Sequence, residues 1–476
     1  MPVLEPHGKN CYRIPRQGVM KADVIVYLNQ SLYEDFKEEQ PLQQLVDAAS
    51  LTGVISPVVG MPDIHTGFGL PIGGVMAMDA SEGLVSAGAV GMDINCGVRL
   101  LQSNLAVKEL SVPELKKLIV AIEKRVPSGI GQKSKHAGLV SRHFNDLLTK
   151  GVAHLASIGI GRAKDLESIE DGGCMEGADV TILSQKAVER GLQLSTIGGG
   201  NHFIEIGYVD KIYDADAALS FGLHEGKISV LIHTGSRGFG HQVCTDYSSE
   251  MKKVAAKYNL YIPSAGLASV PIKSAEGKRY LGAMACAVNF AFCNRQWITD
   301  DVRKAFSTVF GGNDADYGLD LVYDVAHNTA RFEIIENKMM LIHRKGATRA
   351  LPAGHPENPK RYRSTGHPVL IPGSMGTPSY VIRAESAVAK IYNSVNHGAG
   401  RIMSRTAARK DISVEQLKAG LGAVIVSGRN YRAYLDEAPQ AYKDIDHVVD
   451  TFTEINVSRR VARLRPLAVI KGEGND

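Results

Sequence analysis

The stretch GMDINCGVRL, residues 91–100, decides how both the fold and the function of this chain are interpreted. It follows an apolar, glycine-spaced run, and it places the carboxylate of Asp93 and the thiol of Cys96 three residues apart between glycines. So crowded a setting leaves three interpretations of the cysteine: a buried apolar side chain, a nucleophile or a metal ligand. The choice depends on which residues elsewhere in the chain can reach Cys96.

The length and composition of the chain are those of a globular enzyme. Its 476 residues are 44% hydrophobic and 22% charged, which is typical of a soluble protein with a large core. No apolar run is long enough to span a bilayer, and the N-terminal MPVLEPHGKN lacks the apolar centre of a signal peptide. The six cysteines form no CxxC pair, so we expect no disulfide framework. We therefore expect a cytoplasmic enzyme that does not associate with membranes.

Positive charge gathers in one part of a chain whose net charge is only +4. Residues 341–410 contain twelve Lys or Arg against two acids, Glu357 and Glu385. Such a basic zone is typical of proteins that bind polyanions, although isolated charges more often just face solvent. Glycines interrupt the zone in RKGAT and HGAGR, and this favours phosphate binding.

Strand and helix patterns do not alternate regularly along the chain. Apolar runs rich in β-branched residues predict strands at 22–28, 227–235 and 467–472. Helical patterns occur at 41–51, 112–125, 180–191 and 281–310. This order favours a mixed α+β fold over a doubly wound sheet.

Three further features of the chain can be predicted. No linker of low complexity and no repeat of fixed period divides it, so we expect one domain over residues 1–476. Pro113 and Glu114 after Ser111 are typical of a helix start. Cys286 and Cys293, seven residues apart on one apolar face of the last predicted helix, are expected to be core residues.

Four histidines share a setting at the ends of apolar segments, beside glycine or asparagine. They are His202 in GGGNH, His233 in VLIHTG, His327 in VAHNTARFE and His397 in NHGAGR. One such histidine is more often a hydrogen-bonded core residue than a ligand, but four of them together with Asp93 and Cys96 favour a common site. Imidazole, thiolate and carboxylate together suit manganese, iron, cobalt or zinc. Because the residues come from separate loops, spacing alone does not establish the metal site.

Glycine-rich loops accompany these histidines. In GGGNH, HTGSRGFG, PGSMG and HGAGR, backbone N–H groups can approach a phosphate closely, although none of the four is a Walker P-loop. Metal ligands, phosphate-binding loops and a basic zone together indicate phosphoryl or nucleotidyl transfer on a nucleic acid.

Eight sequence blocks, in this order, resemble the RtcB family of RNA-splicing ligases. They are GMPDIHTGFGLPIGGVMAMD, GMDINCGVRL, GGGNHFIEI, HTGSRGFGHQ, AHNTARFE, RKGATRA, IPGSMGTPSYV and HGAGR. The resemblance runs from about residue 60 to Lys471–Gly472. It implies a single-domain α+β fold with a β-sandwich-like core flanked by helices. It also implies a ligase, dependent on GTP and manganese, that joins an RNA 3′-phosphate or 2′,3′-cyclic phosphate to a 5′-hydroxyl.

The resemblance also implies a role for each matching residue. Asp93, Cys96 and His202 would hold one Mn²⁺, and Cys96, His233 and His327 a second, so that Cys96 bridges two ions. His397 matches the nucleophile, which takes a guanylate from GTP and passes it to the RNA 3′-phosphate as a 3′-diphosphate-guanosine intermediate. RNA phosphates would be held by Arg237, Lys345, Arg401 and Arg405. The guanine nucleotide pocket would include Asn201, Glu205, His327, Asn328, Pro372, Gly373, Ser374, Met375, Ser379, Gly398, Ala399, Gly400, Tyr442 and Lys471.

Several points stay open at the level of sequence. Asp63 and His65 lie in a family block, and we interpret them as structural. His367 and Asn396 replace residues found in some members of the family, which leaves details of substrate handling open. A metallophosphoesterase or a non-catalytic RNA-binding subunit are the alternatives. The substrate would be RNA with broken ends, from tRNA splicing or RNA damage, and an archease-type activator is an expected partner.

Overall fold

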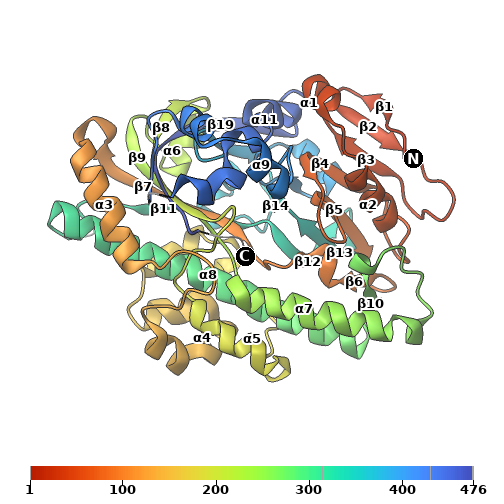
Figure 1. Cartoon of the computed structure of the whole chain (residues 1–476). Coiled ribbons are helices and arrows are strands. Elements are labelled where there is room, and N and C mark those ends of the chain that lie inside the picture. The colour runs from red at the N-terminus through yellow and green to blue at the C-terminus, as the bar shows by residue number, and fades with distance from the viewer. Residues whose placement is uncertain (1, 314, 429, 474–476) are drawn as a thin grey trace.

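Two large β-sheets form the centre of the computed structural model, which describes residues 2–313, 315–428 and 430–473 (Figure 1). The seven-stranded sheet has the order β1 (Glu5–Gly8), β2 (Cys11–Ile14), β3 (Val24–Tyr27), β4 (Val58–His65), β5 (Ile72–Asp79), β13 (Lys338–Lys345) and β12 (Asn328–Ile335). The eight-stranded sheet has the order β11 (Asp320–Ala326), β7 (Gly97–Ala106), β9 (Lys227–Thr234), β8 (Phe203–Ile212), β19 (Ser458–Ile470), β16 (Ser379–Ala384) and β15 (Val369–Ile371), with β18 (Ile425–Val426) beside β19. Two small pairs join β10 (Ser269–Pro271) to β6 (Leu84–Ser86), and β14 (Ala347–Arg349) to β17 (Ser394–Asn396).

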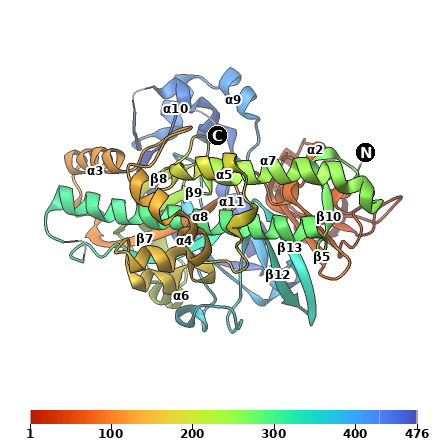
Figure 2. The same ribbon diagram turned by 90° about the horizontal axis from the view of Figure 1, so that it is seen from below.

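Helices cover both large sheets. One face of the eight-stranded sheet shares an apolar cluster with α3 (Val112–Arg125), α4 (Ala137–Ser157), α5 (Gln185–Arg190), α7 (Arg237–Val254) and α8 (Ala275–Phe310), and its other face with α6 (Ala215–Phe221), α9 (Arg405–Asp411) and α10 (Val414–Leu421). The remaining helices are α1 (Gln30–Asp35), α2 (Gln40–Ala48) and α11 (Ile445–Thr453). Seen from below, α7 and α8 run side by side across the molecule (Figure 2). Within the described residues, no helix has the length and apolar character needed to cross a membrane.

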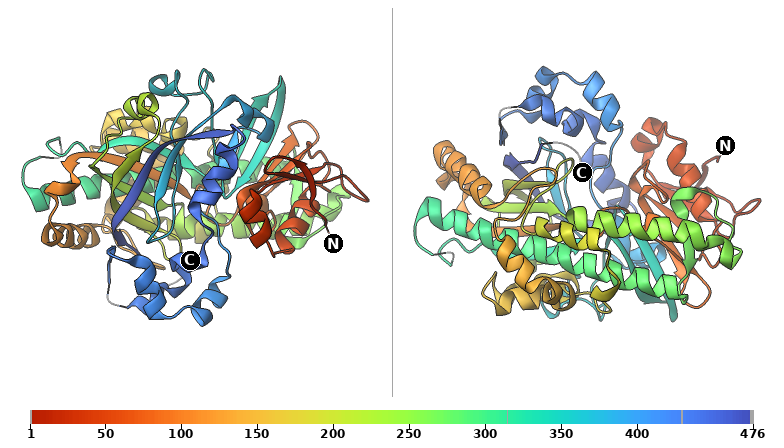
Figure 3. Two further views of the ribbon diagram at one scale, coloured as in Figure 1. Left: turned by 90° about the horizontal axis from the view of Figure 1, so that it is seen from above. Right: turned by 60° about the horizontal axis from the view of Figure 1, so that its bottom comes forward.

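The two large sheets meet through a shared apolar cluster. Val59 of β4, Val75 of β5 and Ile342 of β13 belong to the same cluster as Ile371 of β15 and Ile382 of β16. Burial of these β-branched side chains between sheets provides the main stabilising free energy of such a core. The predicted α+β fold with a sandwich-like core and flanking helices is therefore confirmed. Figure 3 shows the blue segment with α9 and α10 projecting from the sheets on one side.

The predicted elements agree best where local signals were strong. The helix predicted at 112–125 is α3, and Ser111 and Glu114 form a capping box at its start. The helix predicted at 281–310 begins earlier, at Ala275, where Ser274 caps α8, and Cys286 and Cys293 are buried in it as predicted. The predicted strands correspond to β3, β9 and the last part of β19.

The prediction of one continuous helix over 180–191 is wrong. A 3-10 turn at Val180–Ile182 ends at Leu183, which is extended, and Ser184 then caps the short helix α5. Two capping residues close together, Asp179 and Ser184, each begin a separate turn because their side chains accept backbone N–H groups.

Candidate active site

Four neighbouring strands of the eight-stranded sheet bring predicted metal ligands together at one end of these strands. The strands β11, β7, β9 and β8 are antiparallel neighbours, so the end of one lies beside the start of the next. His327 follows β11, Cys96 precedes β7, His233 is near the end of β9, and His202 precedes β8. The pairing of strands therefore collects side chains that are far apart in the sequence.

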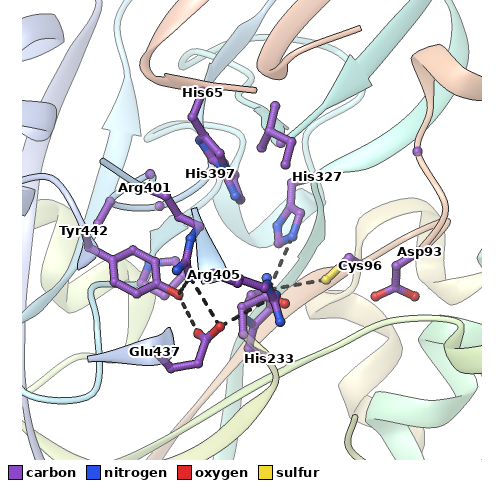
Figure 4. Close-up of a pocket in the computed structure, with 18 of the residues that line it drawn as sticks. His65, Asp93, Cys96, His233, His327, His397, Arg401, Arg405, Glu437 and Tyr442 are labelled. Atoms are coloured by element: carbon purple, nitrogen blue, oxygen red, sulfur yellow. Dashed lines mark hydrogen bonds and ion pairs between the residues drawn. The ribbon is translucent and has the colours of Figure 1, made fainter. Parts of the chain in front are cut away.

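The ligand atoms lie within bonding reach of common centres (Figure 4). Cys96 Sγ is 3.4 Å from His202 Nε2 and 3.3 Å from His233 Nε2. His233 Nε2 is 3.3 Å from His327 Nε2, and His202 Nε2 is 2.9 Å from Asp93 Oδ2. The five residues form two trios that could each hold a metal ion, and Cys96 belongs to both. These are the two trios that the resemblance to the RtcB family implies.

The protonation states of these groups suit cation binding. Burial raises the pKa of Cys96 well above its usual value, and the charge of Asp93 raises it further. Burial lowers the pKa of His233 and of His327 well below the usual value, so both imidazoles are neutral. Burial alone would raise the pKa of Asp93, but the hydrogen bond from His202 and nearby positive charge hold it below its usual value. A carboxylate, a thiol and neutral imidazoles make a donor set that fits a divalent transition metal, which would displace the thiol proton.

A buried arginine holds the loop that carries Cys96. Arg295, in the middle of α8, donates to the carbonyls of Asn95 and Thr234, both at 2.9 Å, and pairs with Asp324 at 2.8 Å. Sequence analysis missed this residue. The available signal was a single cation within an otherwise apolar helical stretch, which needs a buried partner.

Asn328 lies at the joint between the two sheets. It begins β12 of the seven-stranded sheet directly after His327, which follows β11 of the eight-stranded sheet. Its amide donates to the carbonyl of Asp93 at 3.0 Å and accepts from the backbone N–H of Gly346 at 2.8 Å. The joint therefore fixes the metal-ligand loop against the end of β13.

His397 lies beside the ligand cluster, with its ring centroid 4.8 Å from that of His327. The buried carboxylate of Asp63 accepts from the backbone N–H of His397 at 2.9 Å, and lies 2.7 Å from its ring Nδ1. A proton held on Nδ1 by this contact leaves the lone pair on Nε2. Asp63 therefore does more than the structural role expected of it, because it orients the ring and selects its tautomer.

The loop after His397 needs glycine to reach Asp63. Gly400 has φ +74°, and a Cβ there would lie 2.3 Å from the carbonyl oxygen of Asp63. Lys443 fixes the backbone on both sides of Asp63, because its ammonium donates to the carbonyls of Pro62 and Ile64 at 3.0 and 2.7 Å. The nearby His65 binds the Asp63 carbonyl through Nδ1 at 2.8 Å.

A second group of polar side chains centres on Glu437. Its buried carboxylate lies 3.3 Å from Arg401, 3.6 Å from Arg405 and 3.6 Å from Lys471, and it accepts a hydrogen bond from Tyr442. Burial by itself would raise the pKa of Glu437, but these three cations hold it below the usual value. Sequence analysis missed Glu437. A phosphate could bind the same cations by exchanging with this carboxylate.

One cavity of about 940 Å³ connects the two groups. Most of the predicted site residues line it: Asp93, Cys96, Asn201, His202, His233, His327, Asn328, Lys345, Pro372, Gly373, Ser374, Met375, His397, Gly398, Ala399, Gly400, Arg401, Arg405, Tyr442 and Lys471. A volume of this size accommodates a nucleotide.

Three predicted site residues do not line this cavity. Ser379 accepts from the backbone N–H of Gly373 at 3.1 Å and so holds the PGSM loop. The Arg237 guanidinium is buried, and donates to Thr196 Oγ1 at 3.2 Å and the Gly129 carbonyl at 3.0 Å. Burial raises the pKa of Glu205, on β8, to about 8. Their predicted contacts with ligands remain predictions.

The two departures noted in the sequence have different surroundings. His367 stacks on Tyr323, with ring centroids 4.7 Å apart, and does not line the cavity. Asn396 is buried next to His397, and its amide donates to the carbonyl of Gly398 at 3.4 Å. Asn396 is therefore the departure that can affect the loop of His397.

Comparison with known proteins places the chain among RNA ligases. The profile of the family described as "tRNA-splicing ligase RtcB" matches residues 44–472. The chain is 46% identical over 458 residues to the tRNA-splicing ligase RtcB of Thermococcus kodakarensis, with 94% of each chain covered. It is 44% identical to that of Archaeoglobus fulgidus, with 95% of each chain covered. The RNA-splicing ligase RtcB of Mycobacterium tuberculosis is 42% identical, over 90% of this chain and 100% of the relative. At this identity and coverage, the chain belongs to the RtcB family of tRNA-splicing ligases.

Proposed function

We propose that this protein is a GTP-dependent RNA ligase that joins a 3′-phosphate or 2′,3′-cyclic phosphate end to a 5′-hydroxyl end. The observation that carries the proposal is the position of His397: its Nδ1 is 2.7 Å from the buried carboxylate of Asp63, and its ring is beside the metal-ligand cluster. An imidazole held in this way is a nucleophile with a fixed direction of attack. The family membership supports the same reaction class.

The first step forms a bond between His397 and the nucleotide. Nε2 attacks the α-phosphorus of GTP, an N–P bond forms, and pyrophosphate leaves. Asp63 holds the proton on Nδ1 and stabilises the positive charge that develops on the ring. At the Glu437 end of the cavity, Lys471 would bind the nucleotide and Arg401 an RNA phosphate, each released from the shared carboxylate.

The second and third steps transfer the guanylate and seal the RNA. An oxygen of the RNA 3′-phosphate attacks the guanylyl phosphorus and frees His397, which gives the 3′-diphosphate-guanosine end. The 5′-hydroxyl then attacks the 3′ phosphorus and expels GMP. The 5′ end supplies only a nucleophile, so a 5′-phosphate end is not a substrate.

Two manganese ions are proposed as the resident metals. Asp93, Cys96 and His202 would hold one, and Cys96, His233 and His327 the other. Bound metal would supply Lewis-acid charge that offsets the negative charge of the phosphates during each displacement. The proposal extends to one domain over residues 1–476, a cytoplasmic location, a role in tRNA splicing or RNA repair, and an archease-type activator.

The nucleophile can be tested by trapping it with labelled nucleotide. The full chain is incubated with Mn²⁺ and GTP labelled on the α-phosphorus, and the adduct is located by mass spectrometry. We expect one guanylate on His397, labile to acid and stable to alkali as a phosphoramidate is. His397→Ala should give no adduct, whereas the exposed His224, outside the cavity, serves as a control whose alanine variant labels normally.

A second variant tests the role of the carboxylate. The backbone N–H groups of His397 and Gly398 and the ring Nδ1 all contact the single oxygen Oδ2 of Asp63. Asp63→Asn can keep an oxygen at this position but removes the negative charge that stabilises the imidazolium, so labelling should slow about 10²- to 10⁴-fold. Zinc should bind more tightly than manganese without supporting turnover. A protein that releases phosphate without joining ends would be a phosphoesterase, and one that binds RNA without an adduct would be the non-catalytic alternative.

A further inference from the structure

The helix α4 is folded back on itself. Gly151 has φ 57° and ψ −143° inside α4, so the segments on its two sides change direction. A Cβ at this position would lie 2.2 Å from the carbonyl oxygen of Gly173, which excludes any other residue without rearrangement. α4 packs against α8, and it lies at the lower edge of the molecule in Figure 1.

This reversal brings two histidines together. His143 and His154 are eleven residues apart, and in a straight helix they would be separated by about 16 Å along the axis. Instead His154 Nε2 is 3.1 Å from His143 Nδ1. Asp146, one turn after His143 on the same face, has its Oδ2 4.0 Å from His154 Nε2. All three side chains are partly buried, and none lines the main cavity.

The spacing of the two imidazole nitrogens is that of ligands around one metal ion. Two nitrogens that bind one zinc ion at its usual bond length lie roughly 3.0 to 3.4 Å apart, for octahedral or tetrahedral angles respectively. The observed 3.1 Å between the imidazole nitrogens falls in this range. The ligand atoms of the trio lie within 4.8 Å of one another, with Asp146 Oδ2 4.0 Å from His154 Nε2, so the Asp146 carboxylate would move closer when an ion binds.

We propose that His143, Asp146 and His154 form a third metal site, distinct from the two trios around Cys96. Two imidazoles and a carboxylate without sulfur favour a divalent transition metal such as Zn²⁺ over Mg²⁺ or Ca²⁺. The ion would join the two segments of α4 across the turn at Gly151. This site takes no part in the reaction proposed above, and its existence does not depend on that reaction.

One neighbouring cation competes for this site. Lys150 lies 2.7 Å from Asp146 Oδ1, in an exposed i,i+4 ion pair. A metal ion bound by Asp146 must share the carboxylate with this ammonium or displace it. Removal of Lys150 should therefore strengthen metal binding. If the ion pair had only a structural role, its removal would lower the stability of the protein without changing its affinity for metal.

The experiment counts and distinguishes metal ions in the full chain. Metal-free protein is titrated with Zn²⁺ in equilibrium dialysis, and with Co²⁺ while its absorption is recorded. Cobalt bound by Cys96 gives a sulfur-to-metal charge-transfer band, and cobalt bound by nitrogen and oxygen alone gives only ligand-field bands. We expect the parent to bind one more equivalent than His154→Ala, whose sulfur band is unchanged.

Three further variants make the test decisive. His224→Ala should bind as the parent does, since His224 is exposed elsewhere. Asp146→Asn, which keeps the size of the side chain, should bind the third ion at least about tenfold more weakly. Lys150→Ala should bind it about two- to fivefold more tightly, the size of an exposed ion pair. Equal stoichiometry in the parent, His154→Ala and Asp146→Asn would overturn the proposal, and so would unchanged affinity in Lys150→Ala.

Discussion

The two ends of the cavity hold their polar groups in opposite ways. At the end formed by strand termini, the Cys96 thiol and the neutral imidazoles of His233 and His327 lie together, and the carboxylate of Asp93 lies beside His202. At the other end, Arg401, Arg405 and Lys471 surround the carboxylate of Glu437, so positive and negative charges already compensate. The first end is completed by adding cations, and the second can bind an anion only by exchanging an internal partner.

This difference has an energetic consequence. Neutral donors that are buried together gain little from one another and much from a dication, so metal binding there should be strong and weakly dependent on salt. When an anion binds near Glu437, the cations exchange their interaction with the carboxylate for one with a phosphate. The net free energy of binding is then the small difference between two charge-assisted interactions. Substitutions at the two ends should therefore differ widely in effect.

The largest effect is expected at the shared thiol. Cys96→Ala removes a ligand from both trios, so the metal content should fall from the proposed two ions to at most one weakly held ion, and the proposed joining reaction should slow by at least about 10³-fold. Elemental analysis and a ligation assay measure the two quantities. The buried Cys293, which touches neither trio, provides a control: Cys293→Ala should keep both ions. Full metal content in Cys96→Ala would contradict a bridging thiolate.

A pH dependence is expected at Glu205 of β8. Burial raises the pKa of Glu205 to about 8, so its carboxyl is protonated at pH 7. If guanine donates its N–H groups to Glu205, binding needs the ionised form and expels a proton below pH 8. The affinity for GTP should then rise by up to about tenfold per pH unit from pH 6 to 8 and level off above that.

Calorimetric titration of the parent and Glu205→Gln isolates this effect. The glutamine side chain cannot ionise. The slope of log affinity against pH should therefore be smaller in this variant than in the parent, by up to one unit, whatever other groups titrate. Identical slopes in the two proteins would remove Glu205 from the proposed guanine pocket.

A smaller effect separates two cations proposed to hold RNA. Arg405 is partly exposed beside Glu437, whereas the buried ammonium of Lys345 already donates to the carbonyls of Phe68 and Gly88. Arg405→Ala should lower the log–log salt slope of RNA binding by roughly 0.7, the value for one phosphate contact on a single strand. Lys345→Ala should change it less. The measurement is RNA affinity over a series of salt concentrations, and the reverse order of effects would contradict this interpretation.

The smallest effect should have the opposite sign. Glu437→Gln removes the charge that competes with phosphate, so RNA or pyrophosphate should bind about three- to tenfold more tightly at low salt, and the gain should shrink as salt screens it. Joining should not speed up, because the arginines lose the partner that orients them. Weaker anion binding in this variant would mean that Glu437 positions the cations more than it neutralises them.

Local signals in the sequence predicted part of this molecule well. Ser111, Pro113 and Glu114 specify the start of α3 through contacts within one turn, so the sequence alone contained the information. β19 was recognised only in its last part, because arginines such as Arg463 and Arg465 alternate along its exposed face and pair with Asp210. An alternating charged face hides a strand from a search for apolar runs.

The basic zone shows a limit of charge counting. Arg344 and Arg349, two of its twelve cations, are buried and paired with Glu333, which lies outside the counted range. The contact between Asp63 and His397 joins residues 334 apart in the sequence. Only the pairing of strands and loops creates such contacts, so residue type and spacing could suggest the members of the site but not their partners.

The joint at His327 and Asn328 also sets the order in which a growing chain can become active. The first five strands of the seven-stranded sheet are made early, but β12 and β13, which complete it, come after residue 327, and β19 of the other sheet is synthesised last. A chain still attached to the ribosome therefore has Asp93, Cys96, His202 and His233 long before it has His327 or His397. Because the contacts that build the site span most of the sequence, they form late in folding. The unfinished chain therefore lacks part of the candidate site, which is complete only when the last strand and Lys471 have been synthesised.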